Sequence, residues 1–201
     1  MKEFCGTFTA HLKRGIISPM FLVCTALCTA LFLVFVSEND MLDPSKYRNL
    51  PGLHYFLDQA DNRGATYFIM MLTAFPGALM FYEDWKSGNF KFIISRAGRG
   101  NYAFAVTLAA GITAAAVMII TYIIFSAIIL SRFPVISSDQ RNFMQETIGF
   151  PNGGLLRTGH ILLCYFLYFL TRGAMAAFFA MSLYFSRSLS QTDILPRFLP
   201  C

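Results

Sequence analysis

Apolar residues along the chain are gathered in four long runs that polar segments separate. Each run is apolar on every helical face and none alternates, so spanning helices are expected rather than the strands of a membrane barrel. A helix needs about 20 residues to cross a hydrocarbon core of roughly 30 Å. The pattern therefore predicts an all-α, polytopic transmembrane helix bundle of one domain, with four spans at residues 16–36, 65–82, 102–130 and 161–185.

Small residues and a proline predict how these spans pack. The third run has small residues at four-residue spacing, including Gly111, and the fourth has Gly173, Ala177 and Ala180. Such stripes let helix backbones approach closely, although a groove for substrate is the alternative use. The second run is the shortest and contains Pro76 next to a glycine, which predicts a kink.

Composition supports the membrane class and excludes others. Hydrophobic residues make up 56% of the 201 residues and charged residues only 13%, whereas soluble domains carry about 25% charged residues. A soluble enzyme could not bury this apolar surface, and a disordered chain needs low hydrophobicity and high charge. The net charge of +5 is spread between the apolar runs, so it predicts topology and contact with the lipid bilayer, not nucleic-acid binding.

The cysteines predict neither a disulfide framework nor a metal site. There is no C-x-x-C pair among Cys5, Cys24, Cys28, Cys164 and Cys201. Cys24 and Cys28 lie four residues apart in the first run, where small apolar packing residues are expected.

Lys and Arg counts in the flanking segments predict the orientation. The first run is longer than the apolar core of a signal peptide and Ser37 and Glu38 follow it, so we expect a retained span. With the N-terminus inside, nine Lys and Arg residues lie in inner segments and six in outer ones. This agrees with the rule that cytoplasmic segments of membrane proteins carry more Lys and Arg than outer segments do. We expect a multi-pass protein of the cell membrane with both termini cytoplasmic, the 83–101 loop inside and the 38–63 and 132–159 loops outside.

Two short helices are predicted outside the spans. Phe4, Phe8 and Leu12 recur every four residues within residues 1–15, which is typical of a helix lying in the membrane interface. A frayed tail is the alternative. The outer loop 38–63 is rich in turn-forming residues and leaves room for one short helix around 54–60.

The loop between the second and third runs has a pattern of its own. Phe90, Ile93, Ile94 and Ala97 fall at the spacing of one helical face. A Ser-Gly-Asn turn precedes them and Gly98 follows, which suits the start and end of a short helix. A short amphipathic helix between two spans, edged by cations, is a plausible docking element for a soluble partner.

Here the chain resembles the permease subunits of ABC transporters of the ABC-2 (type V exporter-like) family. Members have an acidic residue near the end of the second span, then a Ser/Thr-Gly pair, a short helix ending in Ser/Thr-Arg, and an aromatic residue opening the third span. The corresponding residues are Glu83, Ser87 with Gly88, 93–96, and Tyr102. The order of interfacial helix, spans and loops up to about residue 190 is similar as well.

The resemblance implies a permease subunit of an ATP-driven exporter, without enzymatic activity of its own. It implies a cytoplasmic coupling helix that docks into a separate ATP-binding subunit, and a second permease subunit in a homodimer or heterodimer. The family usually has six spans, so it also implies a truncated product, a fragment or a four-span variant. The residues implied at the ATPase-docking surface are Glu83, Gly88, Phe90, Ile93, Arg96 and Arg99.

Arg172 lies in the middle of the fourth run. A cation at the bilayer centre costs at least about 2.5–3.5 kcal/mol, so it must face protein, a wet cavity or a partner. It could line a translocation path, or it could be held by an internal ion pair or by carbonyl groups.

Motifs for chemistry within the chain are lacking. No phosphate-binding G-x-x-x-x-G-K-Ser/Thr loop occurs, so ATP hydrolysis is expected only in a partner, and no cofactor or catalytic residue is expected. Gly98, Gly100 and Ala103 match a dinucleotide fingerprint but lead into a span, which does not fit that fold. The alternatives are a non-catalytic accessory or immunity protein with permease-like topology and, less favoured, a membrane-bound enzyme.

Overall fold

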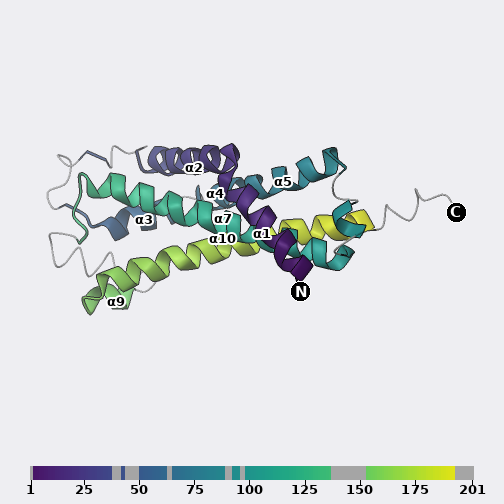
Figure 1. Cartoon of the computed structure of the whole chain (residues 1–201). Coiled ribbons are helices and arrows are strands. Elements are labelled where there is room, and N and C mark those ends of the chain that lie inside the picture. Colours follow the sequence, from purple (N-terminus) through teal and green to yellow (C-terminus); the bar gives the residue numbers. More distant parts are fainter. Residues whose placement is uncertain are drawn as a thin grey trace. The chain divides into compact units, whose positions relative to one another are not determined.

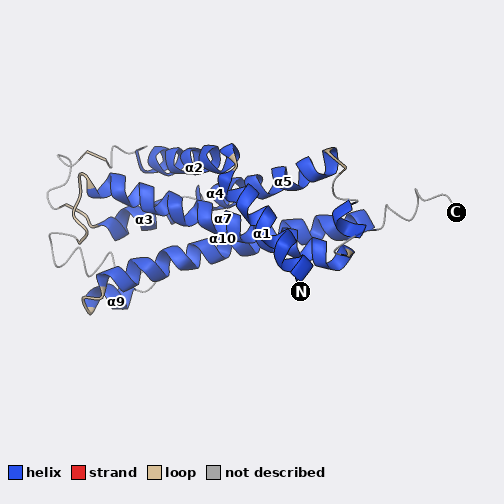
Figure 2. Cartoon of the chain, viewed as in Figure 1, coloured by secondary structure: helices blue, strands red, loops and turns tan. Residues whose placement is uncertain are grey.

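The computed structural model describes residues 2–37, 42–43, 50–62, 65–88, 92–95, 98–136 and 153–192. Within these ranges every regular element is an α-helix and no strand occurs, which confirms the all-α prediction (Figure 2). In chain order the helices are α1 (Lys2–Ile17), α2 (Pro19–Ser37), α3 (Leu53–Asn62), α4 (Ala65–Thr73), α5 (Phe75–Lys86), α7 (Arg99–Leu130), α9 (Gly153–Arg157) and α10 (Ile161–Thr192) (Figure 1).

Three helices of the described chain are long and apolar enough to cross a membrane: Pro19–Ser37, Gly100–Leu130 and Ile161–Tyr184. They correspond to the first, third and fourth predicted spans. The second predicted span passes the same test only as a bent pair, in which Thr66–Asp84 is joined to Leu53–Asp61. The three helices are consistent with a membrane protein, and the number of four spans stays a prediction.

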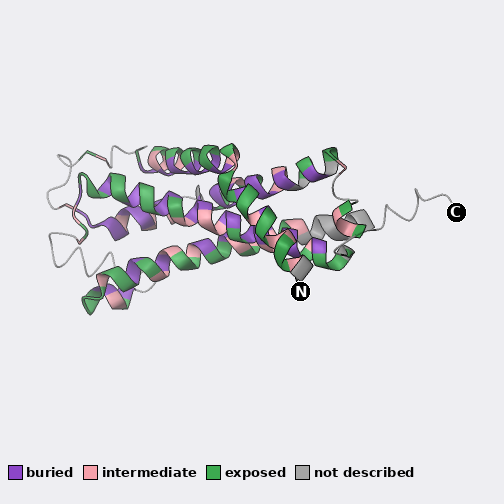
Figure 3. Cartoon of the chain, in the orientation of Figure 1, coloured by how far each residue is buried: buried purple, intermediate pink, exposed green. Residues whose placement is uncertain are grey.

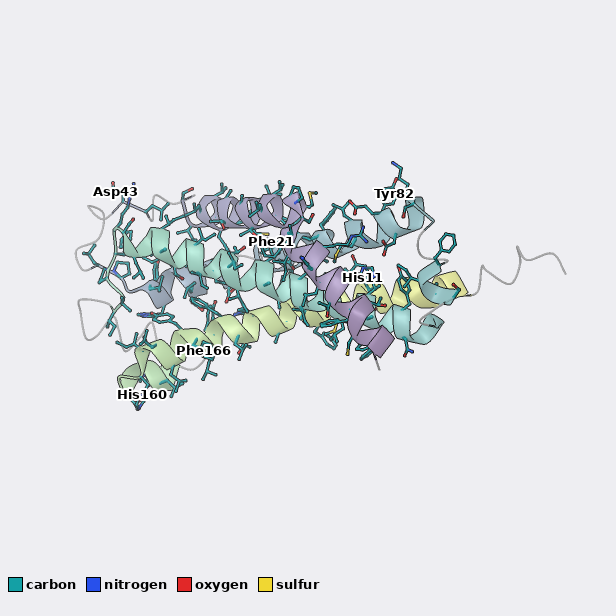
Figure 4. The ribbon with its side chains drawn as sticks, in the orientation of Figure 1. His11, Phe21, Asp43, Tyr82, His160 and Phe166 are labelled. Atoms are coloured by element: carbon teal, nitrogen blue, oxygen red, sulfur yellow. The ribbon has the colours of Figure 1, made fainter. Side chains whose placement is uncertain are left out.

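These helices leave much apolar surface outside the protein core. Only 39% of the apolar window of α2 and 28% of that of α10 are buried. Leu162, Phe166 and Phe178 on α10 are among the large exposed side chains. Figure 3 shows exposed positions along α10, and Figure 4 labels Phe166. A soluble monomer rarely exposes apolar patches on this scale, whereas lipid solvates them well.

The junction of α1 and α2 is a helix cap at Ser18. The Met20 N–H donates to Ser18 Oγ at 3.2 Å, and the Phe21 N–H donates to the Ser18 carbonyl oxygen at 2.9 Å. Pro19 occupies the first helical position, where its missing N–H has no helical partner to lose. The segment predicted as an interfacial helix over 1–15 contains α1, which runs from Lys2 to Ile17, and the first apolar helix begins at Pro19 rather than at residue 16. The position of α1 at a membrane interface stays a prediction.

The chain divides into two compact units. The first unit comprises Met1–Cys24, Met70–Val117 and Ala174–Cys201. A Cβ atom added at Gly77 would lie 2.8 Å from Ala110 Cβ, and one added at Gly111 would lie 2.7 Å from Met181 Cγ and 3.3 Å from the Ala177 carbonyl oxygen. These distances confirm the close helix packing predicted from the small residues of the third and fourth runs.

The helical stretch α4–α5 is interrupted at Ala74, two residues before Pro76. The Ala74 carbonyl oxygen accepts a hydrogen bond from the Ala78 N–H at 3.1 Å and one from the Tyr184 hydroxyl at 3.3 Å. A proline removes a backbone donor and crowds the preceding turn. The interruption therefore lies within one turn of the proline, and α10 contributes a side-chain donor to it. A bend of the span at this point stays a prediction.

The second unit comprises Thr25–Ile69 and Met118–Gly173. Its core is aromatic: the Phe32 ring centroid lies 4.9 Å from that of Tyr122 and 5.4 Å from that of Phe125. Phe56 of α3 packs on Phe133 with centroids 4.5 Å apart. All of these side chains are buried, so apolar burial and ring contacts hold α2 to α7 and hold α3 to the segment that follows α7.

The structure changes the bounds or the content of the predicted loops in three places. The short helix expected around 54–60 is α3, which runs from Leu53 to Asn62. The outer loop predicted at 132–159 contains a further short helix, α9, in its described part. The 83–101 loop was predicted too long, because α5 continues to Lys86 and α7 already begins at Arg99. The single-domain assignment stays a prediction.

Candidate functional site

A buried carboxylate, Asp84, lies in the last turn of α5, within the segment predicted as the docking loop. Only 1% of its side chain is exposed. Arg14 of α1 donates from Nη1 to Asp84 Oδ1 at 2.8 Å, and the Tyr102 hydroxyl of α7 donates to Oδ2 at 3.3 Å. Arg14 also donates from Nη2 to the exposed Glu83 at 3.2 Å. A buried carboxylate needs such donors, and here they tie α1 and α7 to the end of α5.

His11 belongs to the same cluster and lies one turn before Arg14 on α1 (Figure 4). Its Nε2 atom is 3.5 Å from Asp84 Oδ2, and its ring meets that of Tyr102 edge-on with centroids 5.8 Å apart. Its Nδ1 atom is buried without a hydrogen-bond partner among the described residues. Burial is the main reason that the pKa of His11 lies below its usual 6.5; the Asp84 charge opposes this and the Arg14 charge adds to it.

The pKa of Arg14 is raised, whereas that of His11 is lowered. Its hydrogen bond with Asp84 is the largest cause that raises the pKa of the guanidinium above its usual value, and the charges of Asp84 and Glu83 add to it. Arg14 therefore stays charged, while the lowered pKa keeps His11 neutral at pH 7. The cluster pairs a permanent cation with the acidic end of α5.

The connector between α5 and α7 is bounded by two glycines in the left-handed region. Gly88 has φ +72° and Gly98 has φ +78°, a conformation that L-residues with side chains rarely adopt. Between them residues 92–95 form one helical turn, and the Gly98 N–H donates to the Ile94 carbonyl oxygen at 2.9 Å. Phe92 on this turn is 72% exposed. Since the turn lies outside the candidate spans, a large exposed aromatic side chain is available there.

The structure describes only part of the predicted docking surface. Glu83 is exposed, but it lies on α5 and not in the loop, because α5 continues for almost a turn beyond it. Gly88 forms the exit from α5, and Ile93 is half-buried on the helical turn. Arg99 opens α7, and only its backbone is described. The two predicted docking residues that lie outside the described residues are Phe90 and Arg96.

Arg172 is part of a second buried cluster, which lies in the second unit. It forms an ion pair with Asp61 of α3. Asp61 Oδ1 accepts hydrogen bonds from the hydroxyls of Tyr122 on α7 and Thr66 on α4, each at 2.8 Å, and Oδ2 accepts from Arg172 and from the Tyr168 hydroxyl. The Arg172 guanidinium carbon also lies 5.2 Å from the Tyr168 ring centroid, within cation–π range. An internal ion pair is thus present, and a translocation-path role for Arg172 stays a prediction.

Sequence reasoning missed both carboxylates, the buried Asp84 and the largely buried Asp61. Asp61 falls within the segment assigned to an outer loop, and Asp84 within the inner one. A usable signal for Asp61 was the isolated Arg172, because a cation inside a span needs an opposite charge nearby. For Asp84 no comparable signal exists, since acidic residues after an apolar run are the usual sign of a loop.

Both clusters surround a carboxylate with donors from other helices. Among the described residues no group of three or more His, Cys, Asp or Glu side chains could hold a metal ion. Comparisons with protein-family models, with curated proteins and with solved structures find no match for this chain. The functional proposal therefore rests on the apolar helices, the connector and the two clusters.

Proposed function

We propose that the chain is the membrane-embedded permease subunit of an ATP-driven exporter of the ABC-2 type. In this proposal the connector between α5 and α7 docks into a separate ATP-hydrolysing subunit, and a second permease subunit completes the transporter. The observation that carries the proposal is the helical turn 92–95, set between two left-handed glycines, with Phe92 exposed at its surface. An exposed aromatic side chain on a short helix is well suited to fill a pocket of a partner.

Charge supports the same proposal. The segment 83–101 contains four Lys and Arg residues, including Arg96 and Arg99. Cations that edge an apolar contact favour partners with acidic surfaces and orient the encounter. Apolar anchoring by Phe92 and orientation by the arginines would together give a specific contact.

The buried cluster beside the connector supports a mechanical role. Because Asp84 is bonded to Arg14 and Tyr102, the last turn of α5 is joined to α1 and to the start of α7. A partner that displaces the connector would then move three helices together rather than bend one loop. ATP binding and hydrolysis would remain with the partner.

The test is capture of the partner from native membranes with the tagged wild-type chain, followed by identification of the captured proteins. We expect an ATPase subunit. Arg96→Glu/Arg99→Glu should reduce its recovery several-fold, and Phe92→Ala should do so independently. Matched controls are Arg132→Glu/Arg157→Glu and Phe166→Ala, which change exposed residues of the same types elsewhere and should leave recovery unchanged.

Two outcomes would contradict the proposal. Equal recovery with the connector variants would remove the docking role. Absence of any ATPase from the wild-type capture would instead favour a non-catalytic accessory or immunity protein of the same topology.

A further inference from the structure

The carboxylate of Asp61 is surrounded by hydrogen-bond donors from other helices, as a bound carboxylate ligand would be. Its carboxylate receives four hydrogen bonds, two on each oxygen, and all four donors come from helices other than α3. Asp61 is 9% exposed and Arg172 18%. The donors are Thr66 of α4, Tyr122 of α7, and Tyr168 and Arg172 of α10.

The donor set defines the chemistry that it can recognise. It contains one permanent positive charge, that of Arg172, and three neutral hydroxyl groups, so without Asp61 it carries one net positive charge. A guanidinium together with hydroxyl donors matches the two oxygens of a carboxylate better than it matches a single-atom anion. Thr66, Tyr122 and Tyr168 are all buried, so the donors lie in a place where an anion would be strongly attracted.

The position of Asp61 allows it to leave. It is the last but one residue of α3, while the start of the helix is anchored by the Leu53 N–H, which donates to the Val135 carbonyl oxygen at 3.2 Å. Phe56 and Leu57, in the middle of α3, are fully buried. Helix ends fray more easily than helix centres, so release of Asp61 would require only the last turn of α3, including the buried Ala60, to withdraw.

We propose that the donors of α4, α7 and α10 form a carboxylate-binding site, which Asp61 fills in this structure and which a carboxylate-bearing ligand fills when the last turn of α3 withdraws. The assignment of this ligand as transported substrate rests on the proposed transport function. Binding itself does not, because it requires only this chain.

The first experiment restores the missing carboxylate from solution. Asp61→Ala in detergent should unfold at a lower temperature than the wild type, and acetate should recover most of that loss because it replaces the deleted group. Acetamide at the same concentration, with sodium chloride added to equal ionic strength, is the matched neutral ligand and should recover none. In Asp61→Ala/Arg172→Gln the acetate effect should disappear. A folded Asp61→Ala protein that does not respond to acetate would overturn the proposal.

The second experiment keeps Asp61 and tests its displacement. In a chain whose native cysteines are replaced, Gln59→Cys reports on the last turn of α3 and Tyr55→Cys on the first; both positions are half-buried in the wild type. Saturating acetate should speed maleimide labelling at residue 59 several-fold and leave residue 55 unchanged. Unchanged labelling at residue 59 would overturn the displacement, even if Asp61→Ala does not fold. Failure to capture an ATPase would contradict the transport proposal alone.

Discussion

At the scale of single residues, the pair of Asp61 and Arg172 decides what a substitution does. Arg172→Leu leaves Asp61 buried without its cation, and breaking a buried pair in this way costs about 3–5 kcal/mol of stability. Asp61→Leu/Arg172→Leu leaves no buried charge, so we expect it to be more stable than Arg172→Leu alone. Thermal unfolding in detergent of the wild type, both single variants and the double variant gives the coupling energy.

Arg132→Leu is the control for this double-mutant cycle of Asp61 and Arg172, because Arg132 is an exposed arginine that follows α7. Its effect should stay within about 0.5 kcal/mol, as for most surface substitutions. If the losses of the two single variants at Asp61 and Arg172 simply added in the double variant, the ion pair would contribute nothing to stability.

His11 should make stability depend on pH. Its pKa in the folded chain is lowered, chiefly by burial, while Asp84, Arg14 and Tyr102 surround it. The unfolded chain, with a histidine pKa near 6.5, therefore binds the proton more tightly, so stability is full above about pH 6.5 and decreases as the pH falls below it. His11→Gln should lose this part of the pH dependence.

The measurement is the midpoint of thermal unfolding between about pH 8 and about pH 5. The difference between wild type and His11→Gln should change only below about pH 6.5, and His160→Gln, at an exposed histidine, should follow the wild type. Parallel curves for wild type and His11→Gln would show that proton binding at His11 does not differ between the folded and unfolded chain.

At the scale of helices, the contact of α5 with α7 depends on Gly77. A Cβ atom there would lie 2.8 Å from Ala110 Cβ and 3.3 Å from its Cα, and neither atom can rotate away. Gly77→Ala should therefore destabilise the chain by about 1–3 kcal/mol through overpacking, against a gain of at most about 1 kcal/mol from helix propensity.

Gly100→Ala is the matched variant, since Gly100 lies near the start of α7 and nothing lies within 4 Å of an added Cβ atom. It should be neutral or slightly stabilising in the same unfolding measurement. Equal effects of the two alanines would mean that the close approach at Gly77 is relieved without cost by a shift of α5.

The sequence predicts those helices that are marked by features within the helix itself, such as a long apolar run or a proline. α2, α7 and α10 follow from length and apolar content alone, and Pro76 marks the interruption at Ala74 because a proline acts on its own turn. The end of α5 could not be found in this way. Glu83 and Asp84 look like loop residues until Arg14 is known to pair with them, and Arg14 lies 70 residues from Asp84 in the sequence.

The candidate sites were predictable to the same limited degree. A short helix between two apolar runs follows from local spacing, and residues 92–95 form a helical turn; the docking role of that segment stays a prediction. Arg172 could be identified as a cation that needs compensation, but its partner Asp61 lies 111 residues away. Only the folded helices bring Tyr122, Tyr168 and Thr66 to the same carboxylate, and no sequence spacing encodes that set.

At the scale of the whole molecule, each of the two units contains a carboxylate that is stabilised by the same kinds of side chains. Asp84 lies near the C-terminal end of α5 and Asp61 near that of α3, where the helix dipole disfavours a negative charge. In each unit an arginine from another helix and a tyrosine from α7 compensate it. The ends of the two short helices α3 and α5 are thereby held to longer helices by polar contacts.

The number of crossings is the property of the whole chain on which the connector's role depends. The stretch Thr66–Asp84 would be about 28 Å long at 1.5 Å per residue, close to the roughly 30 Å of a hydrocarbon core. We therefore expect it to cross the membrane, which places Asp43 outside and Ser95 inside. In a cysteine-free chain, Asp43→Cys should react with an impermeant maleimide on intact cells, and Ser95→Cys only after the membrane is opened.

His160→Cys, before α10, provides the control, because four crossings would place it on the same side of the membrane as Asp43. If α4 and α5 instead enter and leave on one side, Ser95→Cys would react on intact cells and His160→Cys would not. That pattern would put Phe92 and its helical turn on the outer face, beyond the reach of any cytoplasmic ATPase.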